Sequence, residues 1–195
     1  MPVTINGNGS ITGLSVGGLG SGVVNDTTLA SNAVTSVKLH DDAVVASKLP
    51  SGTVIKYQHT TSTTQTNITS TQTWTTFTGT QVDFTPTFSN SKLDITWSFA
   101  LEGNQNVNGI GFRIYRQSPI GGTDTKIAES YQHSHWGTGS WTGPGDIVLN
   151  WDDSPGVTTP VRYFVQGYRE TGNALYINMG QDSLGITMRV LEIKQ

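Results

Sequence analysis

Residues 92–101 read Lys92-Leu93-Asp94-Ile95-Thr96-Trp97-Ser98-Phe99-Ala100-Leu101, an apolar–polar alternation without an error. Successive side chains of a β-strand point to opposite faces, so strict alternation is typical of a strand with one buried face. No other part of the chain carries so strong a strand signal. The sequence therefore predicts a half-buried strand here, and the rest of the fold is worked outward from it.

Shorter apolar alternations lie on both sides of this strand. They are Val82 and Phe84; Ile110, Phe112 and Ile114; Ile147 to Leu149; Val161, Tyr163 and Val165; Leu175, Ile177 and Met179; and Ile186, Met188 and Val190, with Ile193 near the end. Clusters of Gly, Asn and Pro separate them, and no convincing helical pattern occurs. About eight strands with turn signals roughly every ten residues predict an all-β antiparallel sandwich, a jelly roll, over residues 57–195.

Twelve threonines fall between residues 60 and 80. Threonine favours strands through its β-branch, but a run of polar threonines also suits an exposed loop. We expect residues 60–72 to be mostly a connector and residues 73–78 to form a strand.

A ten-residue sequence repeat precedes this predicted sandwich, which we call the head. Leucines at 29, 39 and 49 and valines at 34, 44 and 54 each repeat at a step of ten, with turn-prone pairs between them. Five residues of α-helix rotate by about 500°, which would leave leucine and valine roughly 140° apart and form no apolar stripe. In one unbroken strand the odd offset would send them to opposite faces. Each decad is therefore expected to be two short extended pieces with a bend.

The decads cannot hold this shape as a single copy. Burying a Leu and a Val contributes roughly 1.5–3 kcal/mol each, whereas ordering ten backbone residues costs about 1–2 kcal/mol each. Three chains around one axis is the simplest closed solution. Residues 25–56 are thus predicted to form a repetitive trimeric β stalk. Its packing residues would be Leu29, Val34, Leu39, Val44, Leu49 and Val54.

Composition narrows the function classes. Charged residues make up 13% of the chain and the net charge is −3, which argues against nucleic-acid binding. Cysteine is absent, no secretory signal is visible, and no apolar run approaches the roughly 20 residues that cross a bilayer. We expect a chain made in the cytoplasm, without membrane insertion. The Gly-rich residues 1–24 are either an anchor ordered by a partner or a disordered tail.

The N-terminal third resembles phage tail-fibre proteins, particularly those of cyanophages and related marine phages. The resemblance is carried by Gly13-Leu14-Ser15-Val16-Gly17-Gly18-Leu19 and by decads reading Ala-Val-Thr-x-x-Lys-Leu, as at residues 33–39. The head looks like the β heads that follow such stalks, through Phe84-Thr85-Pro86, Ser89-Asn90-Ser91-Lys92-Leu93 and residues 186–193. The resemblance implies a homotrimer on the virion. Residues 1–24 would attach to the phage tail or baseplate, and the head would contact a host-surface glycan or protein.

The aromatic and histidine residues after position 130 are the candidate receptor-binding site. Tyr131, His133, His135, Trp136 and Trp141 lie among glycines and are expected on a long loop, with Trp151 further on. Such aromatic residues either stack on sugars or pack into the head. His133 and His135 are two apart, so three chains would offer six imidazoles for a metal, or the two histidines are simply exposed on a loop. We expect no cofactor.

Catalysis is not expected. Asp152-Asp153 either forms a carboxylate or calcium site or belongs to the turn at Ser154-Pro155-Gly156, where aspartate is favoured. No spacing singles out the pair of carboxylates that glycoside hydrolysis needs. The sequence therefore favours a homotrimeric tail fibre that binds the host without catalysis. A purely structural virion spike or connector is the alternative, and a small polysaccharide hydrolase ranks below both.

Overall fold

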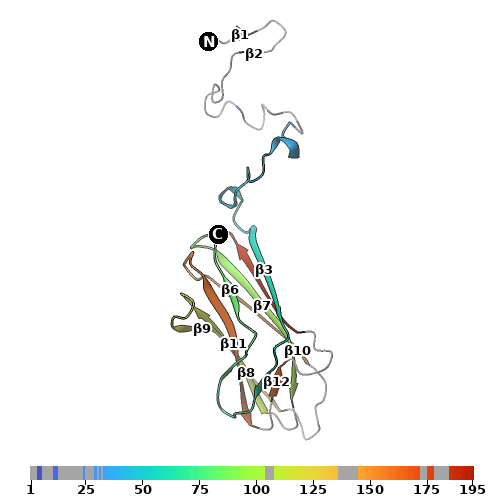
Figure 1. The fold of residues 1–195 in the computed structure, drawn as a ribbon, viewed down its shortest axis with the longest axis vertical. Coiled ribbons are helices and arrows are strands. Elements are labelled where there is room, and N and C mark those ends of the chain that lie inside the picture. The colour runs from blue at the N-terminus through green and yellow to red at the C-terminus, as the bar shows by residue number, and fades with distance from the viewer. Residues whose placement is uncertain are drawn as a thin grey trace. The chain divides into compact units, whose positions relative to one another are not determined.

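The computed structural model describes residues 4–5, 11–12, 24, 29, 31, 33–103, 108–135, 145–171, 175–177 and 185–195 (Figure 1). The chain divides into two compact units, Met1–Val45 and Ala46–Gln195. The first unit contains a small antiparallel pair, β1 (Thr4–Ile5) with β2 (Ile11–Thr12), and the 3₁₀ turn η1 (Ser36–Lys38). The second begins with the 3₁₀ turn η2 (Ala46–Lys48) and continues into a β-sandwich.

The ten-residue period of the sequence is also a period of local structure. The amide of Leu39 donates to Ser36 O at 3.3 Å, and ten residues later Leu49 donates to Ala46 O at 3.2 Å. The tight turns repeat likewise, with Ala43 bonded to His40 and Thr53 to Pro50. Over residues 35–53, where the structure describes the repeat in full, each decad is one 3₁₀ turn and one tight turn, and the two extended pieces predicted from the sequence are wrong there. Local turns pair backbone N–H and C=O groups within a single chain. Isolated extended pieces would leave the same groups unpaired.

The decad leucines and valines stay largely exposed. Val34 is 52% exposed, Leu39 47% and Val44 56%. Among the described residues, eight of the eleven exposed large apolar side chains fall between residues 24 and 54. A single chain therefore buries only about half of the surface of these side chains.

Two antiparallel sheets form the sandwich. In the first, β7 (Lys92–Gly103) pairs on one side with β10 (Gly145–Asp153) and on the other with β13 (Ile186–Ile193) and β12 (Leu175–Ile177) in succession. Beyond them lie β3 (Val54–Ser62) and β4 (Thr66–Ile68). In the second sheet the order is β9 (Asp124–His135), β8 (Asn108–Gln117), β11 (Val161–Thr171), with β5 (Thr75–Thr76) and β6 (Val82–Phe84) at the far edge.

The connectivity is that of a jelly roll. When β3–β4, β5–β6 and β12–β13 are each treated as one interrupted strand, eight strands remain, with orders 1-8-3-6 and 2-7-4-5 in the two sheets. Sheets built from alternating partners in this way are two interlocked Greek keys. The predicted all-β antiparallel sandwich is confirmed.

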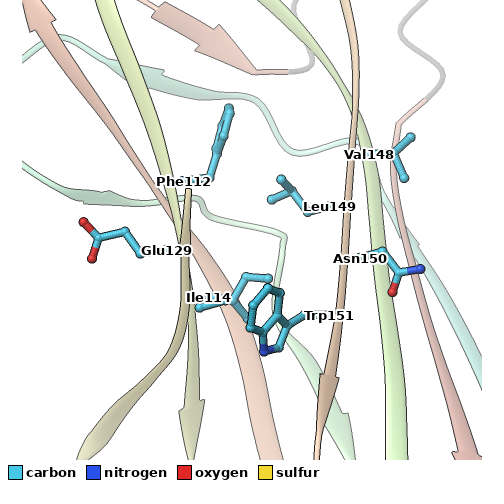
Figure 2. Close-up of a pocket in the computed structure, with 8 residues that line it drawn as sticks. Phe112, Ile114, Glu129, Val148, Leu149, Asn150 and Trp151 are labelled. Carbon is cyan, nitrogen blue, oxygen red and sulfur yellow. The ribbon is translucent and has the colours of Figure 1, made fainter. Parts of the chain in front are cut away.

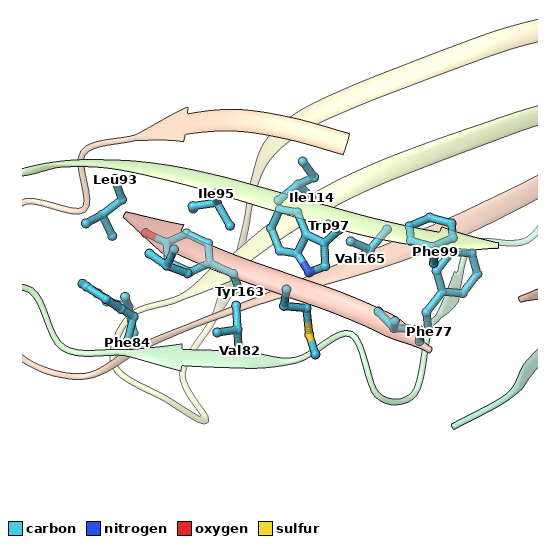
Figure 3. Packing of buried hydrophobic residues seen from close by; sticks show 14 of the residues in the cluster. Phe77, Val82, Phe84, Leu93, Ile95, Trp97, Phe99, Ile114, Tyr163 and Val165 are labelled. Carbon is cyan, nitrogen blue, oxygen red and sulfur yellow. The ribbon is translucent and has the colours of Figure 1, made fainter. Parts of the chain in front are cut away.

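The core lies between the sheets and follows the alternations read from the sequence. Leu93, Ile95, Trp97 and Phe99 of β7 are at most 2% exposed. Figure 3 shows these side chains facing Tyr163 and Val165 of β11, with Phe77, Val82 and Phe84 closing the layer. The indole N–H of Trp97 donates to Thr80 O at 3.0 Å, so its one polar atom is satisfied inside the core.

One core position of β13 holds a carboxylate. The strand alternates Ile186, Met188, Val190 and then Glu192, all at most 1% exposed. Glu192 accepts hydrogen bonds from Thr87 N (2.6 Å) and Oγ1 (2.8 Å), Phe88 N (3.2 Å) and Ser91 Oγ (2.6 Å). These donors compensate the charge and hold the turn before β7 in place.

The C-terminus is joined to the last decad. Gly52 N donates to Lys194 O at 2.7 Å, and Lys194 N donates to Thr53 O at 2.9 Å. The Lys194 ammonium donates to Ser47 O and Leu49 O. Residues 46–53 are therefore fixed to the sandwich.

Several strand boundaries differ from expectation. Residues 60–62 complete β3 and residues 66–68 form β4, so the expected connector over 60–72 is partly strand. Of the strand expected over 73–78, Thr75–Thr76 is regular strand, and Phe77 N also donates to Val165 O of β11 at 3.0 Å. Val54, assigned to stalk packing, begins β3 opposite Ile193.

Candidate functional site

The candidate residues after position 130 fall at the end of β9. Residues 131–135 are strand, with Tyr131 opposite Gly111 and His135 opposite Asn108, so the loop expected there is wrong for these residues. The side chains of Tyr131, His133 and His135, and the whole of Trp136 and Trp141, lie outside the described part of the chain. Their binding roles, including metal binding by the two histidines, stay predictions.

The described aromatic side chain in this region is Trp151, on edge strand β10. Leu149 and Trp151 point from β10 toward Phe112 and Ile114 of the other sheet, whereas Val148 and Asn150 point away (Figure 2). Leu149 is half-buried, but Trp151 is 46% exposed. A cavity of about 220 Å³ lies here, and it is lined by Phe112, Ile114, Ala128, Glu129, Val148, Leu149, Asn150 and Trp151. We call it the β9–β10 slot.

The slot exists because the sandwich is closed along only one long side. On the β3–β6 side, Gln58 Nε2 donates to Asp83 O at 2.7 Å and Lys56 Nζ donates to Thr85 O at 2.6 Å. Lys56 also lies over the ring of Phe84, 4.8 Å from its centroid. On the β9–β10 side the two sheet edges are separated by the slot, whose floor is apolar core.

An ion pair fixes one end of the slot. Arg116 Nη1 lies 2.8 and 2.6 Å from the two oxygens of Asp153, two residues beyond Trp151, and the Tyr163 hydroxyl donates to the same carboxylate at 2.7 Å. Burial, and then the Asp153 charge, raise the pKa of Tyr163 above its ordinary value. This contact joins β10 to β8 and β11 and so holds the sheets at a set spacing.

Asp152 faces the other way. It pairs with Lys92 at 2.5 Å, across β10 and β7. Both aspartates are strand residues with separate cationic partners, so the alternatives of a turn and of a shared carboxylate site are wrong for Asp152-Asp153.

A second hollow, of about 500 Å³, lies along the outer face of β10. It is lined by Asp94, Asn150, Trp151 and Asp152. Asp94 stands directly opposite Asp152 in the β7–β10 pair. Its Oδ1 atom is buried and accepts no hydrogen bond from any described residue. Asn150 and Trp151 border both the slot and this outer hollow.

Glu129, at the rim of the slot, is already neutralised. It lies 2.5 Å from Lys126 Nζ and 3.1 Å from Arg113 Nε. Hydrogen bonds from Lys126 and then Arg113 lower the pKa of Glu129. Arg113 in turn lies 3.7 Å from the ring centroid of Trp74. Glu129 therefore adds little free negative charge to the rim of the slot.

Within the described ranges no group of three or more His, Cys, Asp or Glu side chains is arranged to hold a metal ion. In the same part of the chain, no helix has the length and apolarity needed to span a bilayer.

Comparison with known proteins gives only distant likenesses. No protein-family model matches the chain, and no curated protein sequence is similar to it. Among solved structures, the Eiger TNF of S. frugiperda aligns over 54% of this chain and 60% of its own, at 10% identity and a TM-score of 0.35. Particles derived from infectious bursal virus align over 72% of this chain and 36% of theirs, at 12% identity and a TM-score of 0.40. Carbohydrate-binding modules of the β-sandwich superfamily align over 65% and 56%, at 11% identity and a TM-score of 0.30.

Proposed function

We propose that this chain is a homotrimeric phage tail fibre that attaches the virion to a bacterial surface through noncatalytic binding by its β head. Residues 1–24 attach to a tail or baseplate protein, the decads project from the virion, and the jelly roll meets a host glycan or protein. The attachment is the expectation raised by the resemblance of residues 13–49 to tail fibres.

One observation carries the proposal: leucines and valines repeat every ten residues, and Leu29, Val34, Leu39, Val44 and Val54 are 43% to 56% exposed in a single chain. An exposed apolar row of this kind is not maintained in water without a partner surface. A second and third copy provide that surface at every decad, because each copy presents the same row. The packing residues are Leu29, Val34, Leu39, Val44, Leu49 and Val54.

The head suits adhesion for a separate reason. A rigid sandwich with a bonded ion pair at one end of its open side presents a preformed recess rather than a mobile loop. Three heads on one fibre raise the effective concentration at a repetitive surface, so weak single contacts suffice.

The oligomeric state is tested by light scattering of the full chain. The expected particle mass is three times the 20.9 kDa of one chain. A Leu39→Ser, Val44→Ser double variant should dissociate, whereas Thr60→Ser, a matched change in the head, should not. A wild-type mass of one chain would contradict the trimer.

Host binding is tested with the fluorescently labelled full chain on cyanobacterial cells. The tail-fibre proposal predicts saturable binding to some strains and weaker binding by the dissociated double variant, because avidity is lost. A trimer that binds none of a broad strain panel would instead favour a structural spike or connector.

A further inference from the structure

We infer that the heads of the three copies also contact one another, through an apolar block on the outer face of β3 and β13. The block consists of Val54, Tyr57, Leu191 and Ile193, and its partner is the same block on the two other copies. This inference rests on the proposed function, because it takes the trimer as given. It goes further by placing the threefold axis against one particular face of the head.

The register of the two strands makes these four side chains neighbours on one face. Val54 stands opposite Ile193, and Tyr57 stands opposite Leu191. Glu192 points into the core, so the residues on either side of it in β13 point outward, away from the other sheet. Val54 is 50% exposed and Tyr57 is 59% exposed, whereas the two β13 residues are half-buried. The outer face of this sheet therefore begins, at the β3 edge, with an apolar surface open to water.

The position of β3 in the sheet makes this surface suited to association. β3 is an edge strand of nine residues that pairs with β13 along one side only. A long edge strand with exposed apolar side chains tends to pair with another protein surface. At the neighbouring edge of the other sheet, Asp83 of β6 instead accepts hydrogen bonds of 2.6 and 2.8 Å from Arg162. The charged β6 edge is suited to water, whereas the β3 edge is suited to a partner.

Continuity with the decads identifies that partner as another copy of this chain. Val54 is both the last valine of the ten-residue repeat and the first residue of the block. Gly52 and Thr53 of the last decad are bonded to Lys194, the residue that follows β13. Figure 1 shows the start of β3 and the C-terminus at the same end of the sandwich. Copies whose last decads meet at an axis therefore bring this same part of every head to that axis.

Symmetry sets a second requirement, which the block also meets. A side chain at a threefold axis faces its own two copies, so a charged residue there would meet like charges. The block residues are uncharged, and three Tyr57 hydroxyls can donate to and accept from one another. In the same two rows of the sheet, charged side chains begin on β7, where Lys92 stands opposite Ile193 and Asp94 opposite Leu191. The uncharged part of these rows is thus the part that adjoins the decads.

Crosslinking of the full chain tests the contact directly. The chain contains no cysteine, so a single introduced thiol reports which faces meet. Tyr57→Cys is expected to form covalent dimers with a short bis-maleimide, with one chain of each trimer left unlinked because its thiol has no partner. Val148→Cys is the matched control, since Val148 is 63% exposed on β10, at the opposite edge of the same sheet. This control should run as a single chain on a denaturing gel.

A charge placed in the block tests the same contact without a crosslinker. Tyr57→Asp is expected to raise the protein concentration at which the particle half-dissociates by about tenfold or more, because three carboxylates would meet at the axis. Val148→Asp adds the same charge at the other edge and should leave that concentration unchanged. Both changes fall on exposed side chains, and tryptophan fluorescence checks that each head remains folded.

The results distinguish failure of this inference from failure of the proposed function. If the wild-type particle has the mass of three chains but Tyr57→Cys crosslinks no better than Val148→Cys, the trimer stands and the inference is overturned. Equal effects of the two aspartate variants on dissociation overturn it as well. A wild-type mass of one chain contradicts the trimer and the inference together. A trimer that crosslinks through Tyr57→Cys but binds no host strain supports the inference and contradicts host attachment.

Discussion

Replacing Glu192 by alanine is expected to destabilise the head more than any comparable change of a carboxylate in the described residues. Glu192 occupies a core-facing position of β13 and is fully buried, yet its two oxygens accept four hydrogen bonds from the turn before β7. Alanine removes every acceptor at once. The amides of Thr87 and Phe88 cannot turn to find another partner, whereas the hydroxyls of Thr87 and Ser91 can rotate.

The magnitude follows from those two amides. Leaving a buried donor unsatisfied costs about 1–3 kcal/mol, so two amides set a range of about 2–6 kcal/mol. Two effects lower it, because Thr87 is exposed enough for water to reach and because alanine no longer buries a charge. We therefore expect a loss of about 2–4 kcal/mol in the free energy of unfolding. Glu192→Gln keeps one oxygen for the amides and should cost about half as much.

Urea unfolding of the full chain at one fixed protein concentration, followed by tryptophan fluorescence, measures these losses. The control is Glu129→Ala, which removes a surface carboxylate with two cationic partners and should cost less than about 1 kcal/mol. The reasoning is refuted if Glu192→Ala stays within about 0.5 kcal/mol of the wild type, or if glutamine and alanine cost the same.

Three further outcomes follow from the contacts described above. Gly167→Ala should lower the free energy of unfolding in urea by about 1–3 kcal/mol. A β-carbon at Gly167 would lie 2.0 Å from Cζ of Phe77, in the core. Tyr163→Phe should cost about 1 kcal/mol by removing the donor to Asp153. The pKa of Tyr163 is higher in the folded than in the unfolded protein, where it is about 10. The hydroxyl therefore contributes fully to the free energy of unfolding below about pH 10, and this contribution is lost as the pH rises above that value. The phenylalanine variant should thus lose less stability at alkaline pH than the wild type. Lys194→Met should speed hydrogen exchange at the Leu49 amide without changing exchange in β7, since the ammonium no longer holds that segment by its carbonyls.

Alternation predicted the sandwich well where one face of a strand is apolar. The strand expected over 92–101 lies within β7. The alternations that begin at Val161 and Ile186 lie within β11 and β13. Burial of every second side chain leaves a direct mark on the sequence, and these three strands lie inside their sheets.

Edge strands left no such mark. Residues 124–135 form β9, an edge strand that pairs on one side only, and of its described side chains Ile127 and Ala128 pack against the core. The loop expected around Tyr131 rested on the glycines that follow it, and no apolar alternation in residues 130–135 indicated a strand. The sequence likewise predicts a connector at the threonines of β3, because only four of that strand's nine side chains are even partly buried.

The decads show the opposite case, in which a clear period was recognised but its local geometry was not. A step of ten excludes a helix stripe, but it does not distinguish two extended pieces from a 3₁₀ turn followed by a tight turn. Both bring residues ten apart to equivalent positions. The hydrogen bonds of Leu39 and Leu49 decide between them, and those depend on φ and ψ at single residues rather than on the apolar pattern.

The candidate site depends on a relation that sequence could not supply. Trp151 follows two inward apolar residues of β10, so its alternation alone predicts a core tryptophan like Trp97. It is exposed because the jelly-roll connectivity places β10 and β9 at the open edges of two different sheets, which the Arg116–Asp153 pair joins at one end of the slot. The same β7–β10 pairing places Trp151 opposite Ile95 on the inner face of the sheet and Asp152 opposite Asp94 on its outer face. The sequence shows which residues have aromatic or charged side chains. The topology determines which of those side chains share a surface.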